Sequence, residues 1–446
     1  MNLRAKGRND RQPTIEPEAN TPEANTMELS AHDEALLAGD QGPAARLAMK
    51  IITRMAEVQG AERLLDITAA HCDSTIYLGP ANLEFAERLA GLGARVVVPT
   101  TVNVSGLDEA GWRAWPVPPD YAAFAYRQML AYQSMGCVPT WTCAPYQTDY
   151  RPAFGQQIAW GESNAIVFAN SVIGARTERY PDLLDICAAL TGRVPAIGLH
   201  LPENRCGQLL VHLAGVSPHV QADETFFPVL GYLLGRLAGT RVPVVDNLEA
   251  QPGEDELKAL GAAAASSGAV GLFHIVGITP EAPTRSAAFQ GRRPEQRIDL
   301  TMDDLRAARR SLSTANGQDL DMIVLGSPHF SLAEFAQLAP LLHGGHCHPD
   351  VQFLVTTGRG AAALADRAGY LAALRDFGGK VTLDTCILAT PMLPESVHVL
   401  MTNSAKYAYY SPGLLHTQVA FGSLNDCVRS AVAGRVTIDD ALWQRA

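Results

Sequence analysis

Two cysteines and one lysine have the residue types and surroundings that could do chemistry in this sequence. Cys143 lies in TCAPY, between Pro139 and Pro145, Cys386 lies in DTC, and Lys406 lies in TNSAKYAYYSPG, directly after the apolar run VHVLM. Thiolates are ligands for iron, and an ammonium group can bind or polarise the carboxylate of a substrate. An isolated cysteine is more often a small buried residue, and a lysine can be a snorkelling surface charge. Both interpretations stay open at this point.

Acidic and cationic side chains elsewhere could complete such a site. Glu162 and Ser163, in AWGESNA, immediately precede an apolar run that we predict to be a buried strand. A carboxylate there could be a general acid or base if burial raises its pKa, or it could cap a neighbouring loop. Arg176 and Arg359 also follow predicted strands, and a planar guanidinium can clamp a carboxylate with two hydrogen bonds.

The elements that would position these residues alternate along the chain. Helical patterns such as LEFAERLAGLG, DELKALGAAAASSG and AALADRAGYLAALRDFG separate short apolar runs rich in β-branched residues. The predicted strands include ARVVVP, NAIVFAN, VPAIGLHL, TRVPVVD, GLFHIVG, DMIVLG, VQFLVT, KVTL and VHVLMT. This alternation predicts parallel sheets covered by helices.

Polar segments follow six of the predicted strands. Ligands bind beyond the carboxyl ends of the strands in open α/β sheets, so these segments should lie on one face. Each alone could be ordinary turn chemistry, but six together favour a common site. The segments are TTVN (100–103), NSVIGART (170–177), SPHFS (327–331), TTGR (356–359), DTC (384–386) and TNSAK (402–406).

Histidines stand in two different settings. In GSPHFSLAEF, Ser331 and Glu334 form an S-x-x-E capping box, so a helix should begin there, with free N–H groups near Ser327 and His329. His329 could donate a proton or be structural. The GGHCHP turn (344–349) should lie at the opposite, amino-terminal side of the sheet, so we interpret it as structural. The close ligand spacing typical of zinc sites is absent.

Composition limits the classes of function. The 446 residues suffice for two or three packed subdomains, with 47% apolar and 18% charged residues and a formal net charge of −11. The acidic balance argues against nucleic acid and favours a small-molecule partner. We expect no membrane span or secretory signal, a cytoplasmic protein and reduced thiols. Residues 1–28, which contain PEANTPEANT, should be disordered, and a subdivision is expected near 279–300, which is rich in Pro, Gly and Arg.

Further motifs make the sequence similar to the aconitase X family, the large catalytic portion of dehydratases related to aconitase. The resemblance covers nearly all of residues 29–435 and is most specific in ESNAIVFANSVIGART. It also depends on AHCDSTIYLGP, VPTTVN, CAPY, GRVPAIGLHLPENR, GITPEA, SPHFSLAEF, TTGR, DTC and TNSAKYAYYSPG. It implies an α/β fold, an aconitase-like catalytic core of packed αβα units with mostly parallel sheets, in residues 29–446. The smaller swivelling portion of such enzymes is not evident, so the resemblance implies a separate small subunit and a heterodimer.

The resemblance also implies positions for an iron–sulfur cluster and a substrate. The cluster, [2Fe-2S] or [4Fe-4S], would be held by Cys143, Cys386 and a third position at Ser327. Members that dehydrate mevalonate 5-phosphate often have cysteine at that third position, and a serine hydroxyl is a poor ligand for soft iron, which favours a two-iron cluster. Catalysis is assigned to Lys406, Glu162 and Ser163. The substrate-binding residues that the resemblance implies are Asp73, Ser74, Thr75, Ile76, Asn103 and Val104. Arg176 and Arg359, predicted above from their positions after strands, are added to them.

These features lead to one preferred reaction and two alternatives. The preferred reaction is dehydration of a small hydroxy acid, cis-3-hydroxy-L-proline, to pyrroline-2-carboxylate, with Lys406 holding the carboxylate. The first alternative is the large subunit of a mevalonate 5-phosphate dehydratase, which should have a phosphate site. The second is a non-catalytic partner subunit that has lost its cluster. A Rossmann-type nucleotide enzyme is least favoured, because neither G-x-G-x-x-G after the first strand nor a phosphate-binding P-loop occurs.

Overall fold

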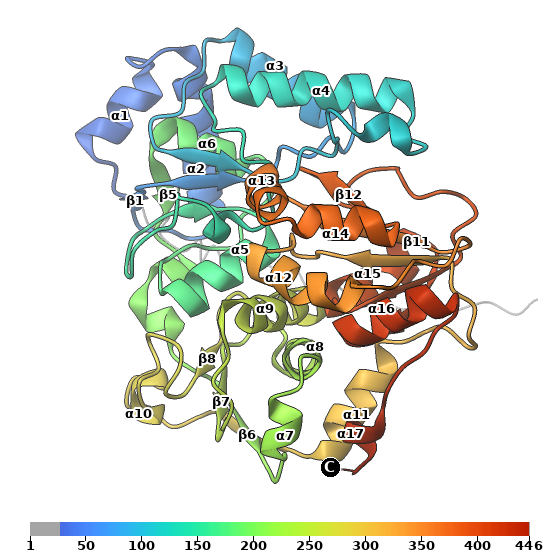
Figure 1. Cartoon of the computed structure of the whole chain (residues 1–446). Coiled ribbons are helices and arrows are strands. Elements are labelled where there is room, and N and C mark those ends of the chain that lie inside the picture. The colour runs from blue at the N-terminus through green and yellow to red at the C-terminus, as the bar shows by residue number, and fades with distance from the viewer. Residues whose placement is uncertain (1–26, 446) are drawn as a thin grey trace, which may run out of the picture.

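The chain folds into three packed α/β units in a computed structural model that describes residues 27–445. Residues 1–26 of the expected disordered tail lie outside the described residues. The prediction was wrong for the last two residues of that tail. Met27 packs against the hydrophobic core, and Glu28 forms a parallel bridge with Arg63. The N-terminal unit lies at the top of Figure 1, the middle unit at the bottom, and the C-terminal unit beside them at the right.

The N-terminal unit contains a small parallel sheet with strand order β3-β2-β4 and a separate antiparallel pair, β1 and β5. Its strands are β1 (Leu64–Asp66), β2 (Ala70–Cys72), β3 (Thr100–Val102), β4 (Ala159–Trp160) and β5 (Arg193–Pro195). Its α-helices are α1 (Ala31–Ala38), α2 (Pro43–Val58), α3 (Pro80–Gly91), α4 (Pro119–Ser134), α5 (Ser163–Phe168) and α6 (Leu184–Thr191). Shorter turns of helix are η1 (Trp112–Ala114), η2 (Pro145–Gln147), η3 (Ala169–Ile173), η4 (Gly198–His200) and η5 (Pro202–Arg205).

The middle unit is a four-stranded parallel sheet with strand order β8-β7-β6-β9. Its strands are β6 (Leu209–Leu213), β7 (Pro243–Asp246), β8 (His274–Ile275) and β9 (Gln296–Leu300). Its helices are α7 (Pro218–Gln221), α8 (Phe226–Ala238), α9 (Glu254–Gly268), α10 (Arg285–Ala288) and α11 (Met302–Ser311). Residues 279–300, where we expected a subdivision, connect β8 to β9 within this one sheet.

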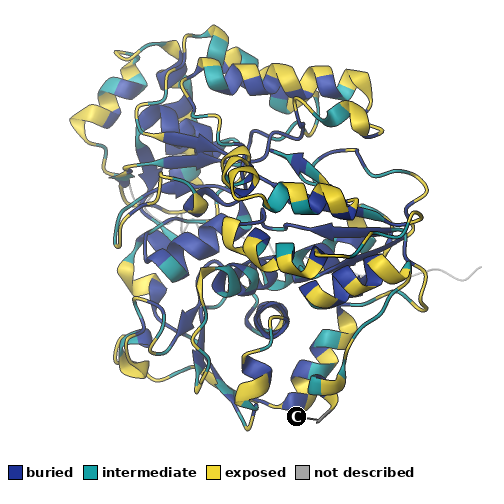
Figure 2. Cartoon of the chain, in the orientation of Figure 1, coloured by how far each residue is buried: buried dark blue, intermediate teal, exposed yellow. Residues whose placement is uncertain are grey.

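The C-terminal unit is a five-stranded parallel sheet with strand order β12-β11-β10-β13-β14. Its strands are β10 (Met322–Leu325), β11 (Gln352–Thr357), β12 (Lys380–Leu383), β13 (Val399–Thr402) and β14 (Gln418–Phe421). Its helices are α12 (Leu332–Leu342), α13 (Arg359–Arg367), α14 (Tyr370–Phe377), α15 (Ala405–Leu414) and α16 (Leu424–Ala433). The last helix, α17 (Ala441–Arg445), packs against α7 of the middle unit. Every residue of β10 and β13 is buried, as expected for central parallel strands with helices on both faces, which explains their unbroken apolar runs. Figure 2 shows the strands of this sheet mostly in the dark blue of buried residues, while the helices that cover them have exposed outer faces.

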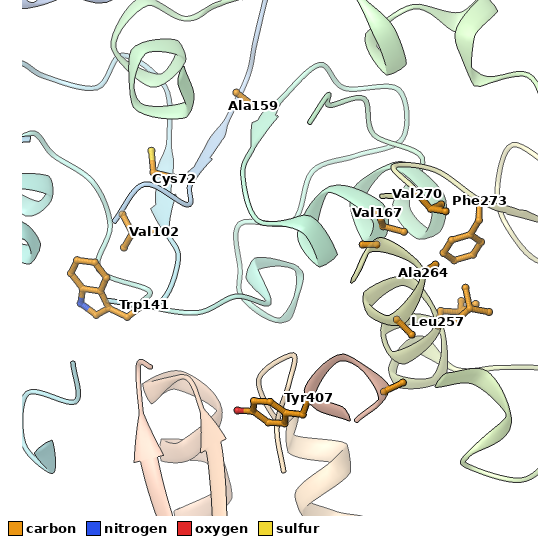
Figure 3. Packing of buried hydrophobic residues seen from close by; sticks show 14 of the residues in the cluster. Cys72, Val102, Trp141, Ala159, Val167, Leu257, Ala264, Val270, Phe273 and Tyr407 are labelled. Atoms are coloured by element: carbon orange, nitrogen blue, oxygen red, sulfur yellow. The ribbon is translucent and has the colours of Figure 1, made fainter. Parts of the chain in front are cut away.

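Helix α9 joins the three units because it packs against α8, α5 and α15. The contact with α8 is very close: a Cβ on Gly268 would lie 1.7 Å from the carbonyl oxygen of Gly235. Only glycine allows such an approach of two backbones. Figure 3 shows Leu257 and Ala264 near Val167 and Phe273, while Cys72, Val102 and Ala159 pack in the N-terminal sheet. The mixed α/β fold with mostly parallel sheets is therefore confirmed.

Two predicted strands were wrong. NAIVFAN forms α5 and the π-turn η3, because the Glu162 side chain accepts hydrogen bonds from the backbone N–H groups of Asn164 and Ala165 and caps a helix. Residues 170–177 therefore do not follow a strand. In ARVVVP, Val96 and Val97 donate to Met135 and Ala189 on separate elements, and the strand begins after Pro99. The long helical pattern after TTGR also divides, into α13 and α14, at Gly369, which has a φ of +82°.

Candidate active site

Lys406 and Glu162 form a buried ion pair between the N-terminal and C-terminal units. The Lys406 Nζ lies 2.5 Å from the Glu162 Oε1, and the two side chains are 11% and 8% exposed. Lys406 lies in the first turn of α15, directly after β13, where Ser404 caps the helix through the Tyr407 N–H. Tyr407 packs among the buried residues (Figure 3). Its hydroxyl lies 3.1 Å from Thr356 Oγ1, which fixes the start of this helix. Lys406 is therefore not a solvated surface charge.

The Glu162 carboxylate is held in place from several sides. Glu162 has a φ of +65°, and its Oε2 accepts the N–H groups of Asn164 and Ala165 at 2.8 and 3.0 Å. The Asn164 amide also donates to Glu162 and, at 2.9 Å, to the carbonyl of Cys143. Ser163 Oγ lies 3.5 Å from the remaining oxygen, Oε1. Oε1 of the carboxylate therefore faces Lys406, while Oε2 is linked through the Asn164 amide to the loop of Cys143.

The two cysteines of interest lie beside this pair. Burial and the charge of Glu162 raise the pKa of the Cys143 thiol to about 12, and Lys406 opposes that rise. Burial also raises the pKa of Cys386, while Lys406 and two backbone N–H groups lower it. For Lys406 itself, burial disfavours the charged form, but Glu162 and the two thiols outweigh it and raise its pKa. Lys406 is therefore charged at neutral pH, and both thiols would have to release protons to bind a metal.

The loop that carries Ser327 lies at the same place. The His329 N–H donates to Cys143 Sγ at 3.2 Å, and Ser404 Oγ donates to the Ser327 carbonyl. The predicted capping box is confirmed: Ser331 caps α12 and Glu334 returns the bond. Ser327, Cys143, Cys386 and Lys406 are thus brought together, although the first two are 184 positions apart in the sequence.

The residues present fit an iron–sulfur group in part. The buried Cys143 and the partly exposed Cys386 both lie near enough to Lys406 for its charge to lower the pKa of their thiols, which suits thiolate ligation of iron. Within residues 27–445, however, no group of three or more His, Cys, Asp or Glu side chains is arranged to hold a metal ion. Of the three positions that the resemblance implies as ligands, two are thiols, Cys143 and Cys386, and the third, Ser327, is a hydroxyl.

The loop after β2 brings Asp73 to Glu162. The Asp185 carboxylate accepts the N–H groups of Asp73 and Ser74 at 2.6 and 3.1 Å and the Ser74 hydroxyl at 2.6 Å. Asp73 accepts a hydrogen bond from Asn103. Burial, followed by the charges of Glu162 and Asp185, raises the pKa of Asp73 to about 7. Asp73 can therefore hold or release a proton near neutrality.

The other implied substrate-binding residues differ in their surroundings. Thr75 Oγ1 lies within 3.5 Å of backbone carbonyls at Cys72, Asn103 and Val104, and Val104 is buried, so these residues shape the loop from within. Ile76 is partly exposed. Arg359 pairs with Asp384 at 2.5 Å and with Glu109 at 3.0 Å.

Arg176 was predicted to follow a strand, and that prediction was wrong, because η3 precedes it. Burial lowers the pKa of His200 most, followed by the charges of Arg205 and Arg176. Arg176 therefore lies near His200.

Sequence reasoning missed three polar residues at the site, Asp185, Asn164 and Thr142. Thr142 precedes Cys143, and its hydroxyl lies 3.0 Å from the His329 ring. Asp185 looks like an ordinary first-turn acid of a helix, and its partners are more than 100 positions away. Asn164 stood inside a run interpreted as a strand. Only the helix-capping role of Glu162 could have placed it at the site.

Comparison with known proteins adds to this geometry. Models of the aconitase X first, second and third domains match residues 26–203, 207–310 and 320–433. The chain belongs to the aconitase X family. The three matched regions contain the strands β1–β5, β6–β9 and β10–β14, so each corresponds to one of the three units of the fold.

Relatives within the aconitase X family have two names. The chain is 48% identical over 418 residues to a cis-3-hydroxy-L-proline dehydratase of Pseudomonas aeruginosa, covering 93% of this chain and 72% of that protein. It is 46% identical to the enzyme of the same name from Hypocrea jecorina, covering 92% of this chain and 69% of that protein. It is 35% identical to a phosphomevalonate dehydratase large subunit of Methanothermobacter thermautotrophicus, covering 90% of this chain and 98% of that protein. All three are named dehydratases, which are hydro-lyases.

A solved structure supports the fold. The crystal structure of Thermococcus kodakaraensis aconitase X in its holo-form aligns with a TM-score of 0.82 and 32% identity, covering 91% of this chain and all of that one. None of the helices between residues 27 and 445 combines the length and apolarity needed to cross a bilayer.

Proposed function

We propose that this aconitase X chain is the catalytic portion of a dehydratase that converts cis-3-hydroxy-L-proline to pyrroline-2-carboxylate. The buried Lys406–Glu162 pair, whose lysine charge interacts with Cys143 and Cys386, carries the proposal, because an ammonium group in such surroundings could bind a substrate carboxylate next to a thiolate-held metal. The relatives of that name, at 48% and 46% identity, support the choice of substrate.

The charges around the site favour a carboxylate over a phosphate ester. Cations near the cysteines each have acidic partners: Lys406 has Glu162, Arg359 has Asp384 and Glu109, and Lys258 has Asp255 and Glu334. A phosphate group carries close to two negative charges at neutral pH and is normally met by several cations. Phosphomevalonate dehydration therefore ranks second.

An iron–sulfur cluster is the proposed cofactor, held by Cys143 and Cys386. When bound it supplies a Lewis acid for the departing 3-hydroxyl group. Ser327 occupies the third position, and its hydroxyl favours a two-iron cluster over one that needs three thiolates. The Lys406 charge would stabilise both thiolates, because it lowers the pKa of each thiol.

The chain's own residues would handle the substrate and one proton. Dehydration breaks the Cα–H and C3–O bonds, forms a C=C bond and releases water, and the resulting enamine tautomerises to the pyrroline. Lys406 would hold the carboxylate and stabilise the negative charge that develops on it. Ser163 and Glu162 are the proposed pair for the Cα proton, since the serine hydroxyl lies within reach of the carboxylate. Asp73 and Asn103, with the rest of loop 73–76 and Val104, would shape the pocket.

A small swivelling subunit of the same family is the proposed partner. The chain aligns with 98% of a relative that is named a large subunit, but with 72% of the Pseudomonas dehydratase. A relative that is named a large subunit implies a smaller companion chain, and a heterodimer with such a companion is proposed for this chain. A cytoplasmic location is also proposed, because all eight cysteines are free thiols.

Anaerobic co-expression with a small subunit encoded next to this chain tests the proposed function. Iron, sulfide and the consumption of cis-3-hydroxy-L-proline and mevalonate 5-phosphate are measured on the same preparation. Iron together with turnover of the hydroxyproline supports the proposal. Turnover of mevalonate 5-phosphate alone would replace the substrate, and colourless protein without iron would indicate a partner subunit that has lost its cluster.

A further inference from the structure

His329 connects the two cysteine loops. Its side chain is fully buried, and its ring Nδ1 lies 3.0 Å from Thr142 Oγ1, next to Cys143. Its Nε2 lies 3.0 Å from the carbonyl oxygen of Thr385, next to Cys386. Its backbone N–H donates to Cys143 Sγ at 3.2 Å. One residue therefore contacts both loops, which come from different units of the fold.

The hydrogen-bond directions of the ring are fixed by its partners. A carbonyl oxygen only accepts, so the Nε2 of His329 must carry the proton, and Nδ1 must then accept from the Thr142 hydroxyl. The Thr142 oxygen accepts in turn from the Ala144 N–H at 3.1 Å. The result is one directed chain of hydrogen bonds from the residue after Cys143 to the residue before Cys386. Both ring nitrogens are occupied, so the alternative role of His329 as a proton donor to substrate is not favoured.

Hydrogen bonds and ion pairs hold the backbone around His329 in place. It precedes the capped start of α12, where Ser331 Oγ also donates to Asp255 Oδ2 at 2.7 Å. Lys258 is paired with Asp255 at 2.7 Å and with Glu334 at 2.5 Å, which ties α9 to the same turn. On the other side, a Cβ on Gly358 would lie 3.2 Å from Thr142 Cβ, so this backbone packs against Thr142. We refer to Thr142, His329 and Thr385, joined by the two hydrogen bonds of the ring, as the clamp.

We propose that His329 is a positioning residue that fixes the separation and orientation of the Cys143 and Cys386 thiols as a pair of ligands. The inference rests on the proposed function, in which these two thiols hold the iron–sulfur group. Residues that orient metal ligands in this way typically change metal affinity about 10-fold to 100-fold when they are replaced.

Three variants and one control test the clamp on the co-expressed complex. H329Q places an amide near the Nε2 position and can keep the bond to Thr385, H329N can keep the bond to Thr142, and H329A loses both. His274 is the matched control, because it is equally buried and bonded to one backbone carbonyl, that of Arg205 at 2.8 Å. H274A removes a buried imidazole without touching either cysteine loop.

Two measurements are made on folded protein, with melting temperatures recorded for each variant. The first is iron and sulfide per chain with the visible spectrum. The second, on metal-free protein, is the yield of a Cys143–Cys386 cross-link formed by dibromobimane, a short reagent that joins two neighbouring thiols, mapped by mass spectrometry. We expect H329A to lose metal affinity about 10-fold to 100-fold and to cross-link several-fold less, with H329Q and H329N in between. H274A should match the wild type in both.

The outcomes separate the clamp from the function on which it rests. Wild-type protein that cross-links these thiols but takes up no iron would overturn the cluster and leave the clamp supported, provided that H329A cross-links less. Equal cross-linking and equal iron in H329A and the wild type would overturn the clamp. If H274A loses as much iron and cross-linking as H329A does, the clamp would also be overturned, because the effect would then follow from general destabilisation.

Discussion

Two lysines with little exposure to solvent, Lys258 and Lys406, have different surroundings. Lys258, on α9, has two carboxylates within 2.7 Å, those of Asp255 and Glu334. Lys406, on α15, has the single carboxylate of Glu162 at 2.5 Å. For both, burial disfavours the charge, and the acidic neighbours outweigh it and raise the pKa. Both lysines are therefore charged at neutral pH.

The difference lies in how many donors are used. An ammonium group has three N–H donors, and Lys258 places its donors on two carboxylates that join α9 to α12. Among the described residues, Lys406 hydrogen-bonds to Glu162, and its charge also acts on two thiols. Lys258 has the surroundings of a structural ion pair. Lys406 keeps donor capacity for a ligand, which is what a substrate-binding residue needs.

Lys406→Met gives the sharpest test of this difference. The substitution keeps the length of the side chain and removes the charge, so we expect kcat/KM to fall at least about 1,000-fold through loss of carboxylate binding and charge stabilisation. The fold should persist, because Glu162 keeps its bonds to the Asn164 and Ala165 N–H groups. Steady-state kinetics with hydroxyproline and a melting curve check both points. Unchanged catalytic efficiency would contradict the assigned role.

Cysteine substitutions extend the test to the ligands beside Lys406. Cys143→Ser and Cys386→Ser should each abolish or greatly reduce bound iron, because a serine hydroxyl is a poor ligand for soft iron. Cys427→Ser is the matched control, since Cys427 is buried on α16 away from Lys406. Iron and sulfide analysis after anaerobic purification decides the result. Full iron in C143S or C386S would show that the ligands lie elsewhere.

Much of this site could be predicted from the sequence, and the reasons are physical. Cys386, Ser327 and Lys406 follow β12, β10 and β13, and parallel strands bring their carboxyl ends to one edge of the sheet. The capping box at Ser331 was readable because it is local. Glu162 was assigned to the site by family resemblance and lies against Lys406 in the structure. The run that follows it was misread as a strand, because an apolar run of that length does not distinguish a buried helix from a buried strand.

The network around the site could not be predicted. Asp185 meets Ser74 across 111 positions, and Lys258 meets Glu334 across 76. Helical spacing places Asp255 three residues before Lys258, but nothing local indicates that both are turned inward toward another unit. Such contacts depend on how the three units pack together.

Lys258→Met should act on stability and leave chemistry largely intact. Removing the ammonium leaves the carboxylates of Asp255 and Glu334 without their buried cation, and breaking a buried pair in this way costs about 3–5 kcal/mol. Urea unfolding measures the loss in the free energy of unfolding. The iron content and kcat of the protein that remains folded should stay within a few-fold of the wild type. A variant with normal stability but no turnover would reverse the roles assigned to the two lysines.

Asp73→Asn has the smallest expected effect. It tests whether the acidic groups around Lys406 destabilise the folded protein. Burial and the charges of Glu162 and Asp185 raise the pKa of Asp73 from 3.8 to about 7, so the folded state binds this proton more tightly than the unfolded state does. Stability then falls as pH rises between about 4 and 7, and the full cost is present above that range. An asparagine cannot ionise, so D73N should become more stable relative to the wild type as pH increases from 5 to 8. If the difference in the free energy of unfolding between the two proteins is the same at every pH, Asp73 ionises in the folded protein as it does in the unfolded chain. Its neighbours would then not destabilise the folded state.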